Sequence, residues 1–148
     1  MRLKEIMTPG VAKISPDATL QVAAEQMRSN DIGALPVFLA DRIIGMLTDR
    51  DIAIRSVAAG CDPNLAKVSD AMSPGITWCF DDDDVEGAAA LMEKQQIRRL
   101  LVIDHSREIV GIVTLGDVAR HSHNHVLSGE ILKHVSMPSN QNGYSSPM

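Results

Sequence analysis

Two pairs of threonine and aspartate in this sequence have the types and spacing of residues that can bind a nucleotide. Thr48 precedes Asp51 by three residues, and the same spacing returns in Thr114 and Asp117. Each pair follows a glycine and two apolar residues, where a predicted strand turns into a helix. A carboxylate there can accept hydrogen bonds from two ribose hydroxyls, while the threonine hydroxyl and the first free N–H groups of the helix suit phosphate oxygens.

The same residue types also satisfy an ordinary helix start. In a capping box, a threonine hydroxyl and an acidic side chain three residues later each accept a backbone N–H of the other residue. Duplicated caps would recur just as duplicated ligand contacts would. The repetition therefore does not choose between the two interpretations, and both stay open at this point.

The cationic residues near these pairs differ between the two halves of the chain. Arg98 and Arg99 precede the second predicted hairpin, where the first half has Gly33 and Ala34. The first half instead carries Arg50 inside its threonine and aspartate pair, where the second half has a glycine. Each half thus takes its positive charge from a different element. Surface ion pairs, worth only ~0–1 kcal/mol each, are the alternative use of these arginines.

Two further clusters could bind metal ions. The run Asp81–Asp84 stands directly before a predicted helix, where the helix dipole favours negative charge and one aspartate can cap the helix; a divalent-ion site is the alternative. His121, His123 and His125 alternate, and His134 lies beyond them. If the preceding helix continues, His121 and His125 lie one turn apart and could share a zinc ion. A solvated helix end is the simpler interpretation.

The cysteines and the standard catalytic motifs add little. Cys61 falls in a predicted loop and Cys79 in a predicted strand, so they form no C-x-x-C pair. We expect two unpaired thiols in a reducing compartment, with a disulfide between them as the alternative. Because nucleophile-elbow, P-loop and dinucleotide-binding glycine motifs are missing from the sequence, we expect no enzyme activity and no catalytic cofactor.

The composition indicates a soluble protein with an aliphatic core. The chain has 148 residues, a formal charge of −5, 45% hydrophobic residues and 3% aromatic residues. This length suits one compact domain or two closely packed subdomains, built from helices on small sheets. The spread negative charge argues against nucleic-acid binding, and no apolar run approaches the ~18 residues of a membrane span. We therefore expect a cytoplasmic protein that binds neither nucleic acid nor a membrane.

The elements that position these residues occur twice. Ile6–Val11 returns as Ala71–Ile76, and Ile43–Asp51 returns as Ile109–Asp117, about 65 residues later. Apolar residues recur at i, i+3, i+4 and i+7 in the predicted helices and form continuous runs in the predicted strands, so each copy is a β-α-β-β-α unit. Two such units are expected to pack on each other and to form paired sites.

The expected elements of the first copy are a strand at 11–14, a helix at 19–29 capped by Thr19, strands at 35–39 and 43–47, and a helix at about 49–59. The second copy repeats this order, with a short helix at 66–71, a helix starting near residue 85 and a hairpin at 100–113 that is one residue longer. We expect repeat 1 at residues 1–60, a linker at 61–66, repeat 2 at 67–122, a C-terminal helical extension at 123–137 and a disordered tail at 138–148.

Both copies resemble CBS domains, the modules named after cystathionine β-synthase. The resemblance rests on Met7–Gly10, Asp31–Val37 and Gly45–Ile52 with their counterparts in the second copy, and covers about residues 1 to 122. It is strongest to stand-alone bacterial CBS-pair proteins of the hypoxic-response and stress type. It implies an α/β fold in which two β-α-β-β-α repeats pack with pseudo-twofold symmetry into one CBS pair, a Bateman-type module, and in which two modules form a homodimer.

The resemblance also implies clefts between the repeats that bind AMP, ADP, ATP, NAD or S-adenosylmethionine as regulatory ligands. In these clefts Asp51 and Asp117 would hold the ribose, Thr48 and Thr114 phosphate or ribose oxygens, and Arg50, Arg98 and Arg99 the phosphates. The adenine slot would be formed by Val11, Ala12, Ile14, Pro36, Ile76 and Thr77. Leu101, the counterpart of Pro36, departs from the family pattern. Trp78 could stack on a base, although burial in an interface is its simpler use.

The expected function is that of a sensor. Ligand binding would shift the population of conformations, and the homodimer would signal this change to an unidentified protein partner. The alternatives are an interaction protein with vestigial clefts, and metal-dependent assembly through His121, His123 and His125.

Overall fold

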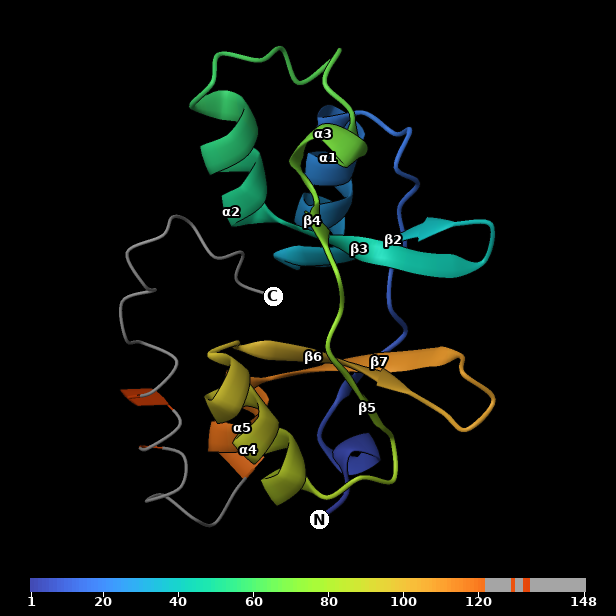
Figure 1. Cartoon of the computed structure of the whole chain (residues 1–148), viewed down its shortest axis with the longest axis vertical. Helices are drawn as coiled ribbons and strands as arrows, with labels where there is room; N and C mark the ends of the chain where they lie inside the picture. Colours follow the sequence, from blue (N-terminus) through green and yellow to red (C-terminus); the bar gives the residue numbers. More distant parts are fainter. Residues whose placement is uncertain (122–128, 130–131, 134–148) are drawn as a thin grey trace. The chain divides into compact units, whose positions relative to one another are not determined.

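The computed structural model describes residues 1–121, 129 and 132–133, and the chain divides into two compact units (Figure 1). Unit 1 combines Met1–Val11 with the residues from Thr77 onward, and unit 2 is Ala12–Ile76. Each unit therefore joins one copy of the repeat to the leading segment of the other copy. The expected tail at 138–148 lies outside the described residues, as does the expected extension at 123–137 apart from Gly129, Leu132 and Lys133.

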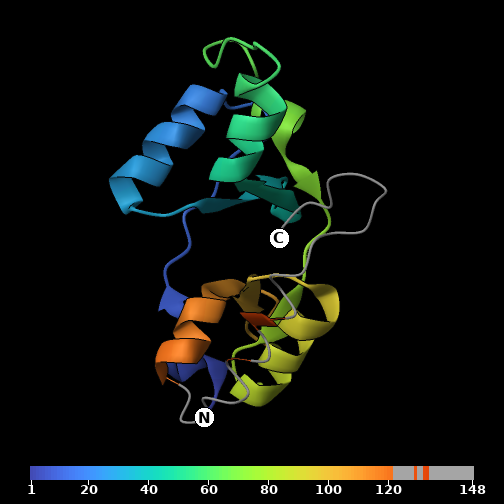
Figure 2. The same cartoon turned by 90° about the vertical axis from the view of Figure 1, so that its left-hand side faces the viewer.

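Unit 2 is a three-stranded sheet with its helices on one face (Figure 2). Its elements are α1 (Leu20–Asn30), β2 (Ala34–Leu39), β3 (Arg42–Thr48), α2 (Asp49–Asp51), the π-helix η2 (Ile52–Val57), α3 (Val68–Ala71) and β4 (Ser73–Pro74). The strand order is β2-β3-β4, and both pairings are antiparallel. The two-residue turn between β2 and β3 places Ala40 and Asp41 at φ values of 50° and 60°, as expected for a tight hairpin.

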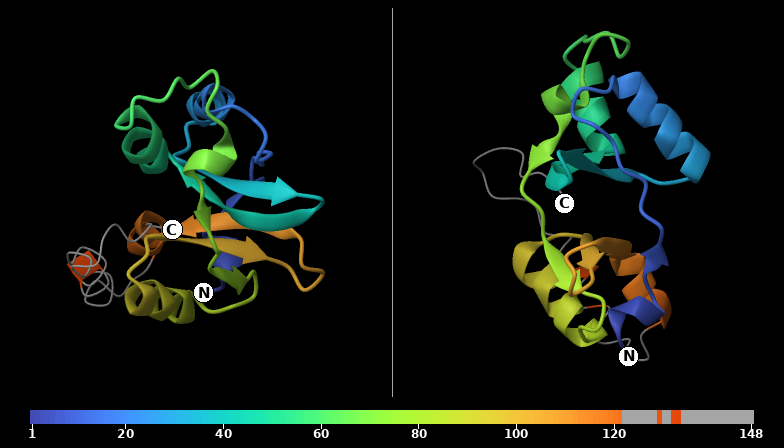
Figure 3. Two further views of the ribbon diagram at one scale, coloured as in Figure 1. Left: turned by 45° about the horizontal axis from the view of Figure 1, so that its top comes forward. Right: turned by 90° about the vertical axis from the view of Figure 1, so that its right-hand side faces the viewer.

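Unit 1 is a four-stranded sheet in the order β1-β7-β6-β5. Its elements are the 3-10 helix η1 (Leu3–Glu5), β1 (Thr8–Pro9), β5 (Trp78–Phe80), α4 (Val85–Gln95), β6 (Arg99–Ile103), β7 (Ile109–Thr114) and α5 (Leu115–His121). The strand β5 runs parallel to β6, and β1 pairs antiparallel with β7. Figure 3 shows the N-terminal segment beside the strands and helices of the second copy.

The long helix of each copy forms for local reasons that the sequence makes visible. In α1 the Thr19 hydroxyl accepts a hydrogen bond from Val22 N at 3.2 Å, which satisfies one of the free N–H groups at the helix start. Left-handed residues end both helices, Asp31 at φ 51° after α1 and Gln96 at φ 54° after α4. The predicted helix at 19–29 and its threonine cap are thereby confirmed, with a shift of one residue.

Each unit has its own aliphatic core. In unit 2 the buried residues are Ile14, Leu20, Ala23, Met27, Leu35, Val37, Leu47, Val68 and Ala71. In unit 1 they are Leu3, Ile6, Cys79, Val85, Ala88, Ala89, Met92, Ile97, Leu100, Val102, Val113, Leu115 and Val118. Both lists include residues from the leading segment of the other copy. Burial of this apolar surface holds each leading segment in the unit of the other copy, and we call these two pieces the exchanged segments.

Three sequence predictions need correction. The strand expected at 11–14 is a single bridge between Ile14 and Val37. Pro16 stands where Asp81 of the second copy donates its N–H to Ile103, and proline has no N–H to extend the pairing. The helix expected at 49–59 changes to π geometry after its first turn, and the one expected at 66–71 begins at residue 68.

Within the described part of the chain, no helix is long and apolar enough to cross a bilayer.

Candidate functional site

Unit 1 contains a pocket of about 420 Å³ at the junction of its central hairpin and α5. The residues lining it are Arg98, Arg99, Thr114, Leu115, Gly116, Ala119, Gly129 and Leu132. Three of them, Arg98, Arg99 and Thr114, were predicted as ligand contacts from the sequence. The pocket therefore combines two guanidinium groups and a hydroxyl with apolar side chains.

The hairpin brings these three residues together. Arg99 at the start of β6 pairs in register with Thr114 at the end of β7. The adjacent carbonyl of Arg98 accepts a hydrogen bond from Leu115 N at 2.8 Å, which ties the start of α5 to the start of β6. Within the described residues Arg98 has no salt-bridge partner, so no neighbouring carboxylate there neutralises its charge. The geometry suits an anionic group in the pocket.

Asp117 is not among the lining residues of the pocket and acts as the cap of α5. Its carboxylate accepts hydrogen bonds from Thr114 N at 2.8 Å and from the Thr114 hydroxyl at 3.0 Å, and its own N–H donates to that hydroxyl at 3.1 Å. The other carboxylate oxygen accepts a bond from Arg120 at 2.5 Å. Asp117 is 4% exposed. The capping interpretation is thus confirmed for the second copy.

The first copy forms the same cap in a more enclosed place. Thr48 N donates to Asp51 at 3.0 Å, and Asp51 N donates to the Thr48 hydroxyl at 3.0 Å. Asp51 is fully buried and lies 3.8 Å from Nε of Arg55. The Ser73 hydroxyl lies 3.5 Å from both carboxylate oxygens. The capping interpretation therefore holds in both copies, whatever further role these carboxylates have.

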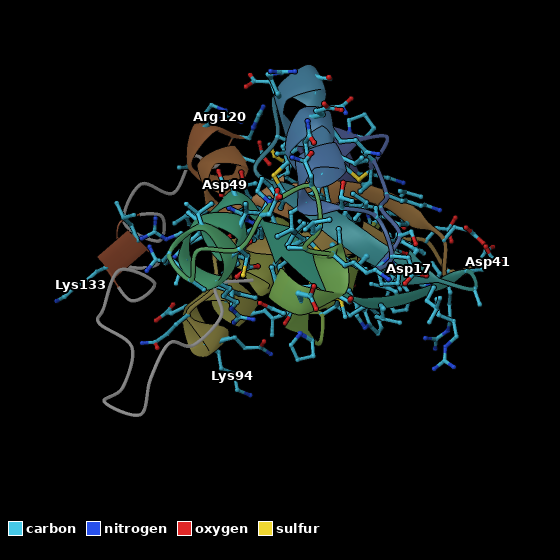
Figure 4. All side chains as sticks on the ribbon, turned by 90° about the horizontal axis from the view of Figure 1, so that it is seen from above. Asp17, Asp41, Asp49, Lys94, Arg120 and Lys133 are labelled. Carbon is cyan, nitrogen blue, oxygen red and sulfur yellow. The ribbon has the colours of Figure 1, made fainter. Side chains whose placement is uncertain are left out.

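The two copies differ in charge at equivalent positions. Asp49 N donates to Gly33 O at 2.9 Å, which is the counterpart of the bond between Leu115 and Arg98. A Cβ at Gly33 would lie 3.0 Å from Oδ2 of Asp49, whose exposed side chain is labelled in Figure 4. Asp49 of unit 2 thus stands where unit 1 has Leu115, and Gly33 of unit 2 stands where unit 1 has Arg98. Unit 1 has a positive charge at this junction of strand and helix, and unit 2 has a negative charge there.

The predicted adenine contacts are divided between the two units. In unit 2, Ile14 and Pro36 are both buried, and Ile14 N donates to Pro36 O at 3.1 Å. In unit 1, the Thr77 hydroxyl lies 2.8 Å from Gln95 Oε1. Val11 in unit 1 and Ala12, Arg50 and Ile76 in unit 2 do not line the described pocket. Of the predicted site residues, only Arg98, Arg99 and Thr114 line the described pocket.

Several lining residues of the pocket were not predicted. Leu115 and Ala119 are four residues apart, so they share the face of α5 that begins at Thr114. That spacing could have identified them once the helix start was known. Gly129 and Leu132 are distant in sequence and carry no comparable signal.

The remaining candidate clusters are placed as follows. Asp84 occupies the N-cap position of α4, but its side chain makes no capping hydrogen bond, which corrects the expected aspartate cap. His121 ends α5, with Nδ1 3.0 Å from Asp117 O, and His123, His125 and His134 lie outside the described residues.

The thiols and the indole are also defined. Cys61 is exposed and Cys79 is buried, and both are free. Burial raises the pKa of the Cys79 thiol to about 11, with a smaller contribution from Asp83. Trp78 is 36% exposed, and its ring meets that of Phe80 edge to face at 5.1 Å. The indole is thus only partly covered by the described chain.

The comparisons with known proteins agree on one family. The sequence model of the CBS domain matches twice, at residues 3–57 and 68–124. Hypoxic response protein 1 of Mycobacterium tuberculosis is 42% identical over 125 residues, which are 84% of this chain and 87% of that protein. The CBS domain-containing protein YhcV of Bacillus subtilis is 40% identical over 134 residues, 90% of this chain and 94% of its own length.

Solved structures show the same relationship. The crystal structure of Hypoxic Response Protein I with two coordinated zinc ions has a TM-score of 0.70 at 42% identity and covers 82% of this chain and 98% of its own. The structure of CBSX2 in complex with AMP has a TM-score of 0.64 at 25% identity and covers 80% and 93% of the two chains. The predicted pair of α/β CBS repeats is thereby confirmed.

Proposed function

Because this chain belongs to the CBS domain family, whose tandem pairs are regulatory ligand-binding modules, we propose that it senses an adenosine-containing ligand. The candidates are AMP, ADP, ATP, NAD and S-adenosylmethionine. The proposal includes a homodimer that signals to a protein partner in the cytoplasm, without catalysis. The AMP complex of the similar protein CBSX2 supports the ligand class.

The observation that carries the proposal is the arginine pocket of unit 1. Its volume of about 420 Å³ falls in the range of ligand pockets, roughly 300–1,000 Å³. Arg98 and Arg99 supply planar cationic groups that match phosphate oxygens, and no carboxylate is among the described lining residues. Leu115 and Ala119 supply apolar surface beside them. This combination favours a ligand with an anionic and an apolar part.

The roles proposed for the other residues follow from their surroundings. Thr114 lines the pocket, and its hydroxyl donates a hydrogen bond to Asp117, so we assign it a phosphate or ribose oxygen of the ligand. A ribose reaches Asp117 only by displacing Arg120, because that guanidinium occupies the second carboxylate oxygen. Asp51 is fully enclosed, so its ribose role requires the first turn of α2 to open.

The second repeat is proposed as the stronger phosphate site, and the first repeat as the weaker one. In unit 2 the proposed contacts are Thr48 and Arg50 for phosphate, Asp51 for ribose, and Ala12, Ile14, Pro36 and Ile76 for adenine; in unit 1 Val11 and Thr77 serve the adenine. Asp49 opposes phosphate binding in unit 2 by like-charge repulsion.

A paired comparison of AMP with adenosine tests the phosphate assignment. Both ligands are titrated into the full chain by calorimetry, with thermal unfolding as a second readout; saturation at 100 times the dissociation constant adds ~2.7 kcal/mol to stability. We expect AMP to bind more tightly than adenosine. Each of R98A and R99A should lower AMP affinity roughly tenfold or more, since a charge-assisted hydrogen bond is worth ~1.5–3 kcal/mol, and should leave adenosine binding nearly unchanged.

Lys94→Ala is the matched control. Lys94 is an exposed cation near the end of α4, labelled in Figure 4, and does not line the pocket. Its removal changes the net charge of unit 1 equally but should leave the preference for AMP intact. Equal binding of AMP and adenosine, or an equal effect of K94A and R98A, would contradict the phosphate assignment. No binding of any of the five candidate ligands at millimolar concentration would favour the interaction protein with vestigial clefts.

Metal-dependent assembly is a second candidate, supported by the two zinc ions in the structure of Hypoxic Response Protein I. For this chain the proposed ligands are His121 and His125, with His123 between them in the sequence. His121 has its Nδ1 3.0 Å from a backbone carbonyl, which leaves Nε2 for a metal. Assembly of this kind predicts that a chelator lowers the molecular mass in solution and that H121A does the same. A mass unaffected by either change would rule it out.

A further inference from the structure

Two segments of unit 1 bring a nitrogen donor and two carboxylates together away from the arginine pocket. Asp81 and Asp82 follow β5, and His105 lies in the turn between β6 and β7. One donor atom from each lies within 4.8 Å of the other two. His105 Nε2 is 2.9 Å and 3.0 Å from the two carboxylate oxygens of Asp82. None of the three residues lines the arginine pocket.

The backbone of the aspartate segment is fixed from three sides. Asp81 N donates to Ile103 O at 2.9 Å, and Lys4 N donates to Asp81 O at 2.9 Å. The guanidinium of Arg2 donates to Asp82 O at 2.6 Å. These bonds use main-chain atoms of the aspartates, so they hold the segment without occupying the carboxylate oxygens of Asp81 and Asp82.

The histidine is held by its own turn and by a stacked ring. Asp104 accepts backbone hydrogen bonds from Ser106 at 2.9 Å and Glu108 at 3.0 Å, which closes the turn around His105. The imidazole lies parallel to the ring of Phe80, with centroids 4.4 Å apart and planes at 14°. Both sides of the cluster are therefore positioned before any ligand arrives, which lowers the entropy cost of binding.

We propose that Asp81, Asp82 and His105 form a binding site for a divalent transition-metal ion such as Zn²⁺. Imidazole nitrogen and carboxylate oxygen are ligands that Zn²⁺ prefers, at ~2.0–2.2 Å, and tetrahedral donors at that radius are ~3.4 Å apart. The donors of Asp82 and His105, 2.9 Å and 3.0 Å apart, need to separate by roughly half an ångström to reach it, and the donor atom of Asp81 lies within 4.8 Å of both.

In the metal-free fold a proton fills the same position between Asp82 and His105. Metal binding replaces it: the lone pair on Nε2 passes from the proton to the metal, and the proton leaves to solvent. Three protein ligands leave a fourth tetrahedral position for water. The exposed side chains, 65% for His105 and 43% for Asp82, give the ion and its water direct access.

Zinc titration of single variants tests the site. The full chain, without an affinity tag and freed of metal by a chelator, is titrated with zinc chloride by calorimetry. The histidines after α5 can also take up zinc, so the decisive quantity is what each variant loses relative to the parent chain. We expect H105A and D82N each to remove one equivalent, or to weaken it roughly tenfold or more.

A second readout locates the ion. Trp78 is the only tryptophan of the chain, and Phe80 lies between its ring and that of His105, at 5.1 Å and 4.4 Å. Copper(II) chloride, which quenches nearby indoles, should quench Trp78 fluorescence with one saturating equivalent. H105A should abolish the saturating phase, and H121A should not.

Two controls separate metal binding from the ion pair itself. H105Q can keep a hydrogen bond to Asp82 but supplies no imidazole, so it should lose the zinc equivalent as H105A does. D84N removes a neighbouring carboxylate outside the cluster and should retain it. Circular dichroism identifies any variant that is unfolded. Unchanged zinc stoichiometry and affinity in both H105A and D82N would overturn the proposal. Because neither titration involves a nucleotide, this outcome is independent of the test of the proposed nucleotide binding.

Discussion

The two aspartates of the repeated pairs make the same local bond in different surroundings. Each accepts the N–H of the threonine three residues earlier, Asp51 at 3.0 Å and Asp117 at 2.8 Å. The cation beside Asp51 is Arg55, whose side chain is only 29% exposed, whereas Arg120 beside Asp117 is 67% exposed. Loss of the carboxylate therefore leaves a largely covered cation in unit 2 and a solvated one in unit 1.

This difference predicts an order of stability for two matched variants. D51A and D117A each lose a helix cap, which costs ~1–2 kcal/mol. D51A should cost more, ~2–4 kcal/mol in total, because the fully buried carboxylate also pairs with Arg55. Urea unfolding monitored by circular dichroism measures both values. Equal losses of unfolding free energy, or a larger loss for D117A, would contradict the role assigned to the burial of Asp51 beside Arg55.

The His105 and Asp82 pair predicts a specific pH response. The hydrogen bond and charge of Asp82 raise the pKa of His105 above 6.5, and the same bond lowers the pKa of Asp82 below 3.8. A raised histidine pKa stabilises the fold fully below pH 6.5, and this is lost as the pH rises through the raised value. A lowered aspartate pKa stabilises it fully above pH 3.8, and this is lost as the pH falls. The pair therefore contributes most to the stability of the fold between pH 3.8 and pH 6.5.

NMR titration of the imidazole in metal-free protein measures this effect. We expect His105 to titrate above its ordinary value in the parent chain and to return towards it in D82N. D84N is the control, since Asp84 is not among the groups that shift the histidine. An unshifted parent titration, or a titration that D82N leaves unchanged, would show that the pair does not form in solution.

At the scale of elements, one glycine in each hairpin admits the exchanged segment. A Cβ at Gly45 in β3 would collide with the carbonyl oxygen of Ser73 in β4. A Cβ at Gly111 in β7 would lie 2.7 Å from Thr8 O in β1. Both contacts involve backbone, which cannot rotate away as a flexible side chain can. Glycine is therefore required where each short strand docks.

Alanine substitutions at these positions should destabilise the protein. G45A and G111A are each expected to cost ~1–3 kcal/mol through overpacking against backbone. Gly87 in α4 has open space around its Cβ position, so G87A should instead stabilise by ~0.5–1 kcal/mol through helix propensity. Thermal unfolding of the three variants measures these shifts. Stabilisation or neutrality of G45A and G111A would mean that β4 and β1 do not pair as described.

The elements were predictable to the extent that their signals are local. The caps at Thr19, Thr48 and Thr114 and the apolar spacing of α1 depend on neighbours within one turn, and the structure has them all. The π geometry of η2 has no such local signal. The bridge at Ile14 was overestimated as a strand because an apolar run indicates pairing without saying how far it extends.

The pocket was predictable only in part for the same reason. Arg98, Arg99 and Thr114 stand out by residue type and by their position at the ends of adjacent strands. The apolar lining residues look like any others until the helix is in place. The donor set of Asp81, Asp82 and His105 joins residues more than twenty positions apart, and no sequence period connects a loop with a turn.

At the scale of the whole molecule, the compact units do not coincide with the sequence repeats. Leu3 and Ile6 of the first leading segment are buried in the core of unit 1, and Val68 and Ala71 of the second are buried in the core of unit 2. The duplication reveals two equal copies but not which copy each leading segment joins. The strands of the two leading segments, β1 and β4, are each two residues long and are too short to show a sequence pattern.

The exchange predicts which fragments of the first copy fold. A fragment of residues 12–76 contains the complete core of unit 2, whereas a fragment of residues 1–60, cut at the expected repeat boundary, lacks Val68, Ala71 and β4. Burial of a valine side chain alone is worth ~1.5–3 kcal/mol, a large share of the stability of so small a unit. Fragment 12–76 should unfold cooperatively in urea by circular dichroism, and fragment 1–60 should not. V68A in fragment 12–76 should weaken that transition, because Val68 is fully buried. If fragment 1–60 were the more cooperative of the two, the leading segments would belong to their own repeats and the described exchange would be wrong.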